Sequence, residues 1–154
     1  MELKFIPIIG DVRIPSRSDF VFRTYHPQVG FHAATYKHVP LMEENPGEAV
    51  LVNVARSRNV ADKCIEYDVK KMVMILAVNP TNIMGCTKRL AEIYVQSLGL
   101  SIEQGSMKGK TKFVTTHFGN VLGSNGFMIP HFREQIARGG PVTVTHPDIT
   151  RFFM

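Results

Sequence analysis

Apolar residues along this chain follow two different spacings. Lys71–Leu76 (KMVMIL) is a continuous apolar run of the length of a buried strand, whereas the segment from about Thr81 carries apolar residues at helical spacing until Gly99, which is placed to end a helix. That stripe consists of Met84, Thr87, Leu90, Ala91, Tyr94, Val95 and Leu98. The pattern predicts strands at Lys4–Gly10, Val29–Ala34, Lys71–Leu76, Thr111–Phe118 and Pro141–Thr145, and helices at Pro15–Tyr25, Asn53–Tyr67, about Thr81 to Gly99, and His131–Arg138.

The predicted strands and helices alternate along the chain. Such repetition implies right-handed crossovers, and therefore an α/β fold with a parallel sheet and helices on both faces. Binding sites in these sheets lie beyond the carboxyl ends of the strands. The residues at predicted carboxyl ends are Asp11, Ala33–Ala34, Leu76–Pro80 and Phe118–Asn120. We therefore expect a site where these segments meet.

Composition and charge narrow the classes of function. The chain has 154 residues, 44% hydrophobic and 20% charged, which is typical of one globular domain. Its net charge of +5 favours an anionic partner, and because the basic residues are scattered, a phosphorylated small molecule is favoured over nucleic acid. No signal peptide or membrane-length apolar run is present, which predicts a cytoplasmic location.

The two cysteines, Cys64 and Cys86, match no metal-ligand spacing. Both lie in predicted helices, where a cysteine usually acts as a small buried apolar residue. The histidines are dispersed, so no metal site is predicted.

Several motifs together resemble one family, the nucleotide-sugar 4,6-dehydratases of surface polysaccharide biosynthesis, which form the CapD-like branch of the extended short-chain dehydrogenases. The motifs are GDVR at Gly10–Arg13, FHAATYKHVPLMEENP at Phe31–Pro46, AVNPTNIMGCTKRLAE at Ala77–Glu92, and FGNVLGSNGFMIPHFREQIARGGPVTVTHPDITRFFM at Phe118–Met154. They cover nearly the whole chain in the family's order.

The resemblance implies an activity and its partners. Members use NAD or NADP to oxidise the sugar of UDP-N-acetylglucosamine or a close relative at C4. They then eliminate water across C5 and C6 and return the hydride to C6. Members also oligomerise, so this chain is expected to form a homo-oligomer or to pair with a full-length relative.

Lys88 is the predicted catalytic residue. In the superfamily a Tyr-x-x-x-Lys pair lies on one helical face, because four residues make about one turn. The tyrosine moves a proton and the lysine binds the nicotinamide ribose. Here Met84 stands at the tyrosine position, which is a habit of this branch, so the resemblance assigns only ribose binding to Lys88.

The resemblance also implies roles for residues elsewhere in the chain. Those assigned to the cofactor are Asp11 and Val12 near the adenine, Asn53 as a hydrogen-bonding residue nearby, and Ala33 and Ala34, whose small side chains let the strand-end backbone lie against the cofactor. Lys37 is assigned to the cofactor phosphates or to the substrate. Those assigned to the nucleotide-sugar are Asn120 and Ser124.

Each of these residues also has a purely structural interpretation. Asp11 and Asn120 suit turns or helix caps, and the Ala33–Ala34 pair suits tight packing. Lys37 and Lys88 could be solvated surface lysines, and Met84 could be an ordinary core residue.

Two features depart from the family pattern. The Gly-x-x-Gly-x-x-Gly turn that receives the cofactor pyrophosphate at a helix N-terminus is absent, and the chain starts at what resembles the third strand of the fold. A Ser-Thr-Asp-Lys segment, thought to handle proton transfer, is also absent, and Leu76 stands in its place.

The sequence therefore predicts an incomplete Rossmann-like domain over residues 1–154, without the first strands or the C-terminal substrate lobe. By resemblance its function is nucleotide-sugar 4,6-dehydration, with little turnover expected from the chain alone. The alternatives are a non-catalytic nucleotide-sugar-binding or assembly fragment, and a nucleotide-sugar epimerase.

Overall fold

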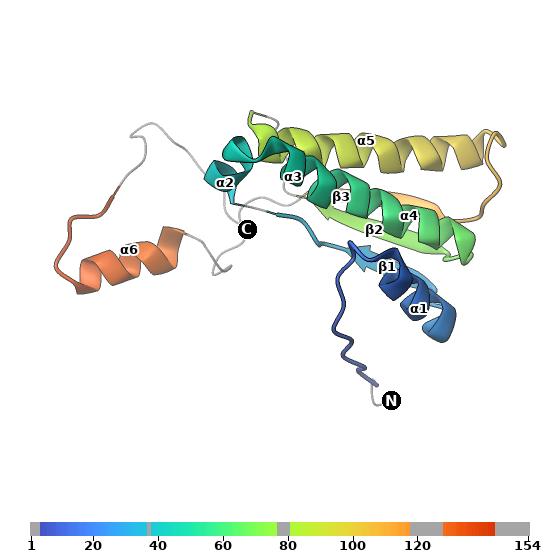
Figure 1. The fold of residues 1–154 in the computed structure, drawn as a ribbon, viewed down its shortest axis with the longest axis horizontal. Coiled ribbons are helices and arrows are strands. Elements are labelled where there is room, and N and C mark those ends of the chain that lie inside the picture. The colour runs from blue at the N-terminus through green and yellow to red at the C-terminus, as the bar shows by residue number, and fades with distance from the viewer. Residues whose placement is uncertain (1–3, 37, 77–80, 118–127, 144–154) are drawn as a thin grey trace. The chain divides into compact units, whose positions relative to one another are not determined.

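The structure is a computed structural model that describes residues 4–36, 38–76, 81–117 and 128–143, without the side chains of residues 128 and 129 (Figure 1). The chain divides into two compact units, Met1–Thr116 and His117–Met154. The first contains the sheet and is described first.

The elements follow one another in α/β order (Figure 1). They are α1 (Pro15–Tyr25), β1 (Val29–His32), α2 (Val39–Glu44), α3 (Pro46–Val50), the π-helical segment η1 (Leu51–Ala55), α4 (Arg56–Glu66), β2 (Lys71–Leu76), α5 (Ile83–Glu103), β3 (Lys112–His117) and α6 (Met128–Ala137). The sheet has the order β1-β2-β3, and β1 pairs with β2 in parallel. The predicted α/β fold is confirmed.

Local sequence explains where the main helices begin and end. Pro15 starts α1, where the missing N–H costs no hydrogen bond, and His26 ends it in a left-handed conformation with φ 41°. Asn82 precedes α5, and its side-chain oxygen accepts a hydrogen bond of 2.8 Å from the Gly85 N–H. This is a standard N-cap, which satisfies a donor that the helix leaves free.

One face of the sheet is covered by helices. Met72, Met74 and Leu76 alternate along β2, so they point to the same side, and all are buried. They form one core cluster with side chains from α1, α4, α5 and the turn before β2, namely Phe22, Ala61, Cys64, Val69, Ala91, Val95 and Leu98. Because Gly30 and His32 are paired with Met72 and Met74, they lie on this helix-covered face.

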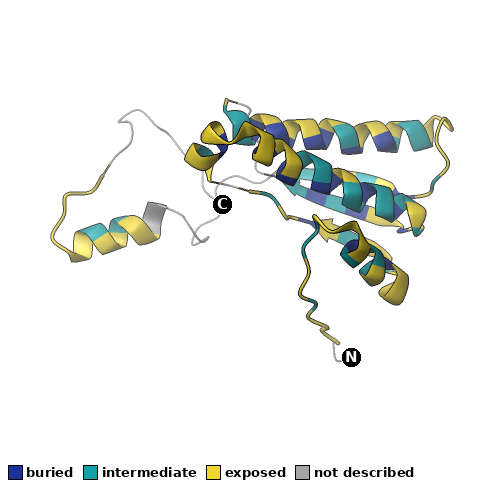
Figure 2. Ribbon diagram, in the orientation of Figure 1, coloured by how far each residue is buried: buried dark blue, intermediate teal, exposed yellow. Residues whose placement is uncertain are grey.

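The opposite face of the sheet carries apolar side chains that the described residues leave open. Phe31 is paired with Val73 on this side and is 73% exposed. Figure 2 shows the contrast between the buried stripes of the helices and the exposed positions on the strands. We define the open face as Val29, Phe31, Val73, Ile75 and Val114, all of them exposed or half-buried.

Two of the predicted strands do not form within the described residues. Lys4–Gly10 is irregular, and the Ile9 carbonyl oxygen accepts side-chain hydrogen bonds from Arg17 in place of a ladder. Pro7 cannot donate to a ladder, and no described strand lies alongside this segment. Residues 141–143 are also irregular, and the rest of the predicted Pro141–Thr145 strand lies outside the described residues.

The predicted end of α5 at Gly99 is wrong, because the helix continues to Glu103. Gly99 faces Phe113 of β3, and a Cβ atom added at Gly99 would lie 3.7 Å from the Phe113 Cβ. Farther along the helix, Ile102 packs beside Gly109. These contacts outweigh the cost of about 1 kcal/mol for a glycine within a helix. The predicted stripe also needs correction, since Leu90 is 50% exposed.

The cysteine prediction is confirmed for one residue only. Cys64 is fully buried beneath β1, but Cys86 is exposed at the start of α5. Cys86 lies two residues from the buried Lys88, on a turn whose inward side is taken by Gly85, Thr87 and Lys88.

The second unit contains α6, which is close to the predicted His131–Arg138 helix. The segment after the helix folds back on it, because the Gln135 side chain exchanges hydrogen bonds with the backbone N–H and side-chain hydroxyl of Thr143, at 3.0 and 2.9 Å. Gly139 and Gly140 make this reversal with positive φ angles of 90° and 77°. Within the part of the chain that the structure describes, no helix is long and apolar enough to cross a membrane.

Candidate functional site

Asn53 lies at the centre of a buried hydrogen-bond network. Its Oδ1 accepts a hydrogen bond of 2.8 Å from the backbone N–H of Tyr36, and its Nδ2 donates one of 3.0 Å to Thr87 Oγ1. The Thr87 hydroxyl in turn donates to the Met84 carbonyl oxygen at 3.0 Å. The network therefore joins the loop after β1, the segment η1 and the first turns of α5.

The π-helical geometry of η1 places Asn53 at this position. A π segment accommodates an extra residue within a helix and is often found at functional sites. Asn53 has no exposed surface, and both sides of its amide have protein partners. Its predicted place near a cofactor stays a prediction.

His32 and Ser57 extend the network to the end of β1. The Ser57 hydroxyl donates to the Asn53 carbonyl oxygen at 2.7 Å, so its oxygen is left to accept from His32 Nε2, which lies 2.9 Å away. This arrangement requires a neutral His32 with its proton on Nε2. Burial lowers the pKa of His32 to about 4, which keeps the ring neutral at pH 7.

Lys88 follows Thr87 in α5 and is only 5% exposed. The interpretation of Lys88 as a solvated surface lysine is therefore wrong. Met84 is half-buried one turn earlier, so the two residues share a face as the spacing predicts. The structure thus holds the ammonium-bearing side chain inside the protein, directly beside the Asn53 network.

Arg56, the first residue of α4, is also buried. Its guanidinium carbon lies 5.5 Å from the centre of the Tyr36 ring, within the range of a cation–π contact. Its Nε and Nη2 atoms are buried without a hydrogen-bond partner. Arg56 and Tyr36 thus bring a buried positive charge to the end of β1.

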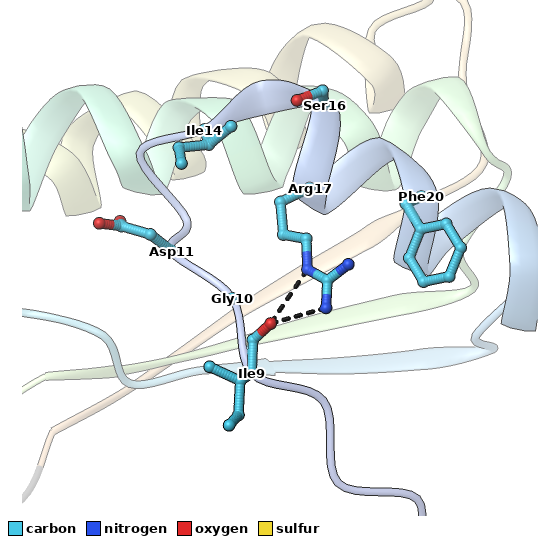
Figure 3. Close-up of a pocket in the computed structure, with 7 residues that line it drawn as sticks. All are labelled: Ile9, Gly10, Asp11, Ile14, Ser16, Arg17 and Phe20. Atoms are coloured by element: carbon cyan, nitrogen blue, oxygen red, sulfur yellow. Dashed lines mark hydrogen bonds between the residues drawn. The ribbon is translucent and has the colours of Figure 1, made fainter.

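Asp11 lies in a tight turn and lines a hollow of about 460 Å³ (Figure 3). One carboxylate oxygen accepts from the Arg13 N–H at 2.8 Å, and the other accepts from Arg13 Nε at 2.5 Å. These hydrogen bonds lower the pKa of Asp11 to about 2, so it is ionised at pH 7. Asp11 is therefore a turn residue at the rim of a hollow, and its predicted role toward an adenine stays a prediction.

Figure 3 also shows how the hollow is built. The Arg17 side chain of α1 reaches back to the Ile9 carbonyl oxygen, with donor–acceptor distances of 3.0 and 2.7 Å. The hollow has a mixed apolar and polar wall of Ile9, Gly10, Asp11, Ile14, Ser16, Arg17 and Phe20. Val12, predicted beside the same ligand, is half-buried.

Ala33 and Ala34 are both exposed just beyond β1. The interpretation that this pair serves tight packing is therefore wrong, since no described side chain covers it. The backbone at the carboxyl end of β1 is accessible to a ligand. Lys37, Asn120 and Ser124 lie outside the described residues, as do residues 77–80 of the junction after β2.

A second hollow of about 520 Å³ has Tyr36 in its wall. Its wall comes from the loop after β1 and from α2 and α3, and consists of Thr35, Tyr36, His38, Leu41, Met42, Asn45, Glu48 and Ala49. No cluster of three potential metal ligands occurs in residues 4–36, 38–76, 81–117 or 128–143.

The sequence interpretation missed several members of this site. The apolar pattern places Thr87 only in the stripe of the later helix, and it gives Arg56 no role. The four-residue spacing of Asn53 and Ser57 is a usable signal, because it puts the backbone carbonyl oxygen of Asn53 within reach of the Ser57 hydroxyl one turn later. Arg56 gave no local signal, since its burial depends on the Tyr36 loop.

The family model described as "Polysaccharide biosynthesis protein" matches residues 1–154. The capsular polysaccharide biosynthesis protein CapD of Staphylococcus aureus is 51% identical over 99% of this chain and 25% of that protein. A UDP-N-acetylglucosamine 4,6-dehydratase (inverting) of Campylobacter jejuni is 36% identical over 95% of this chain and 43% of that protein.

Two further comparisons concern the reaction class and the fold. A UDP-glucose 4-epimerase of Rickettsia akari is 39% identical over 99% of this chain and 43% of that protein. The X-ray structure of Pen from Bacillus thuringiensis superposes with a TM-score of 0.86 at 37% identity, covering 96% of this chain and 45% of that chain. This chain therefore spans a quarter to less than half of these relatives. It belongs to the polysaccharide biosynthesis protein family, with a Rossmann-like fold and with nucleotide-sugar dehydratases and epimerases among its relatives.

Proposed function

We propose that this chain is part of a nucleotide-sugar 4,6-dehydratase of the UDP-N-acetylglucosamine type, acting in surface polysaccharide biosynthesis. The observation that carries the proposal is the buried Lys88 on the same face as Met84, beside the Asn53–Thr87 network. A lysine held in this way suits ribose binding, and a methionine one turn earlier fits the branch that lacks the usual tyrosine. The identity to a 4,6-dehydratase supports the same assignment.

The residues present fit a nicotinamide dinucleotide, NAD or NADP. The Ala33–Ala34 backbone is open at the carboxyl end of β1, where such ligands lie, and the orphaned Arg56 atoms offer donors for an anionic group. Lys88 would bind the ribose hydroxyls. When bound, the cofactor would accept the hydride from C4, which leaves a 4-keto group that makes the C5 proton acidic, and would later return the hydride to C6.

Residues of this chain position Lys88. Thr87 and Asn53 fix the first turns of α5 against the loop after β1, and this sets the direction of Lys88. Met84 has no titratable proton, so the proton transfers at C5 and C6 need other groups. By the family resemblance, Leu76 stands where relatives carry the Ser-Thr-Asp-Lys segment, so the groups expected to make these transfers are missing from this chain. We therefore propose that this chain alone gives little turnover.

A nucleotide-sugar 4-epimerase is the second candidate, favoured by the 39% identity to the Rickettsia protein. Epimerisation at C4 needs hydride transfer and one proton at the C4 oxygen, and no base at C5. It therefore requires fewer acid–base groups than dehydration. The two candidates differ in product, because only dehydration gives a 4-keto-6-deoxy sugar.

A chimera tests the proposed function. This chain replaces the matching 43% of the Campylobacter dehydratase, and UDP-N-acetylglucosamine is converted with and without Ser-Thr-Asp-Lys inserted after Leu76. Inserting the segment after Leu76 keeps the Leu76 side chain in the core, where it is only 2% exposed. We expect the 4-keto-6-deoxy product only from the chimera with the insertion, at a rate about 10²–10⁴ times higher.

Lys88→Met in the active chimera is the control for the site assignment. Slower product formation together with a raised Michaelis constant for the cofactor supports ribose binding by Lys88. Equal turnover with and without the inserted segment would show that proton transfer does not depend on it. Formation of an epimer without a 4-keto product would favour the second candidate.

The family resemblance assigns the cofactor pyrophosphate to a glycine-rich turn that the 154-residue chain lacks. We therefore expect this chain alone to bind NAD weakly. Calorimetric titration of the 154-residue chain should show no binding at micromolar cofactor. A dissociation constant near 1 μM, about −8 kcal/mol, would mean that another segment holds the pyrophosphate.

A further inference from the structure

Arg56 combines burial with missing hydrogen bonds in a way that no other described side chain does. It is only 7% exposed, and its Nε and Nη2 atoms are buried without a partner among the described residues. A guanidinium is charged at every relevant pH and has five N–H donors. Leaving such donors buried and unpaired is costly, so the site carries an unmet requirement for an acceptor.

The groups around Arg56 do not meet this requirement. Tyr36 offers the face of its ring, which attracts the cation but accepts no ordinary hydrogen bond from the guanidinium edge. The Asp11 carboxylate is close enough for electrostatic attraction, but its hydrogen bonds go to Arg13. The missing partner is therefore an additional acceptor.

The position of Arg56 is that of a ligand site. Ser57, the next residue, lies within hydrogen-bond distance of His32, the last residue of β1. Arg56 thus lies near the carboxyl end of β1, and its guanidinium contacts Tyr36, which follows the exposed Ala33–Ala34 pair in the loop after β1. Tyr36, which covers it, is 44% exposed and belongs to a loop, so its ring can move without disturbing the core.

We propose that Arg56 binds the diphosphate of a nucleotide ligand, with Tyr36 moving aside to admit it. The planar guanidinium matches two phosphate oxygens at once, which makes Arg a better partner for a diphosphate than a point charge. The proposal rests on the proposed function only in so far as both a dinucleotide cofactor and a UDP-sugar carry a diphosphate.

The test is binding of inorganic pyrophosphate to the 154-residue chain, measured by calorimetry and by the shift in melting temperature. Arg56→Met is compared with Arg58→Met, which removes the same charge two residues later from an exposed ion pair with Asp62. We expect Arg56→Met to weaken binding at least about tenfold, as for the loss of a charged hydrogen bond. Arg58→Met should leave it within about twofold, since exposed charges contribute little.

One further variant and one further measurement separate a loss of binding from a loss of folding. Arg56→Lys should bind more weakly than the native chain, because it keeps the charge but loses the paired donors. Without ligand, Arg56→Met should melt at the same temperature or higher, because it removes a buried unpaired charge. If both methionine variants lose binding equally, or if Arg56→Met binds as the native chain does, the proposal is overturned.

ADP and UDP distinguish the source of the diphosphate. Arg56-dependent binding of ADP with no binding of UDP assigns the residue to the cofactor, and the reverse assigns it to the nucleotide-sugar. Binding of neither nucleotide, by a chain that binds pyrophosphate independently of Arg56, refutes the assignment. None of these measurements requires turnover, so an inactive chimera and a failed Arg56 site are separate outcomes.

Discussion

The two faces of the sheet are built from equally apolar residues but have different surroundings. On the helix-covered face, Met72, Met74 and Leu76 are buried beneath α4 and α5. On the open face, Phe31 and Val114 remain exposed next to half-buried Val73 and Ile75. An apolar strand residue is therefore no guide to which face is covered.

The two faces also differ in their polar side chains. His32 belongs to the helix-covered face, because it is paired with Met74, and the buried polar network of Asn53 begins there. The polar side chains of this network, His32, Ser57, Asn53 and Thr87, are tolerated under the helices because each has a hydrogen-bond partner. The open face has no such network among the described residues, and its side chains are of the kind that another protein surface covers.

The largest difference should appear in core truncation. Met74→Ala should lower the free energy of unfolding by about 2–5 kcal/mol, because it leaves a cavity under the helices. Val73→Ala, the adjacent residue on the open face, should cost less than about 1.5 kcal/mol. Urea denaturation of both variants measures this, and equal losses would mean that the open face is as tightly packed as the covered one.

Acid should destabilise the chain through His32. The folded pKa is about 4, below the ordinary value of 6.5, so the unfolded state binds more protons between these pH values. Stability is therefore fully present above pH 6.5, falls as the pH drops toward 4, and loses about 3 kcal/mol in total.

Urea denaturation between pH 7 and 4 tests this, with His32→Asn as the variant and His26→Asn as the control. His26 is exposed in a left-handed conformation that asparagine adopts easily. The His32 variant should show a flatter pH dependence and the control should not. The same slope in all three chains would assign the acid sensitivity to other groups.

The Asn53 network should contribute a smaller amount. Asn53→Leu leaves the Tyr36 N–H without its acceptor and removes the donor to Thr87 Oγ1, and it should lower the free energy of unfolding by about 1–3 kcal/mol. Asn59→Leu makes the same chemical change at a half-buried position of α4 and is the matched control. Thermal melts compare the two, and an unchanged melting temperature in Asn53→Leu would show that the network does not stabilise the fold.

The smallest effect on stability is expected on the open face, where solubility should change instead. Purified chain should self-associate or bind a hydrophobic dye, and Phe31→Ser should reduce dye fluorescence while changing stability by less than about 1 kcal/mol. Leu90→Ser, which removes an exposed apolar residue from α5, is the control. A native chain that sediments as a dye-negative monomer would show that the open face is closed in solution.

Sequence alone was sufficient for the fold class, the limits of α1 and β2, and the shared face of Met84 and Lys88. These depend on residue spacing within one element, and period and capping residues are local properties. The family motifs were likewise local stretches of sequence, and the family match confirms them.

Only the tertiary structure decided which groups meet. The burial of Lys88, the joining of Asn53 to Thr87 across 34 residues, and the orphaned Arg56 under Tyr36 all arise from contacts between separate elements. The continuation of α5 past Gly99 has the same origin, since the packing of Phe113 overrides a local stop signal. The spacing of residues along the sequence cannot predict these contacts, because they join elements that come together only when the chain folds.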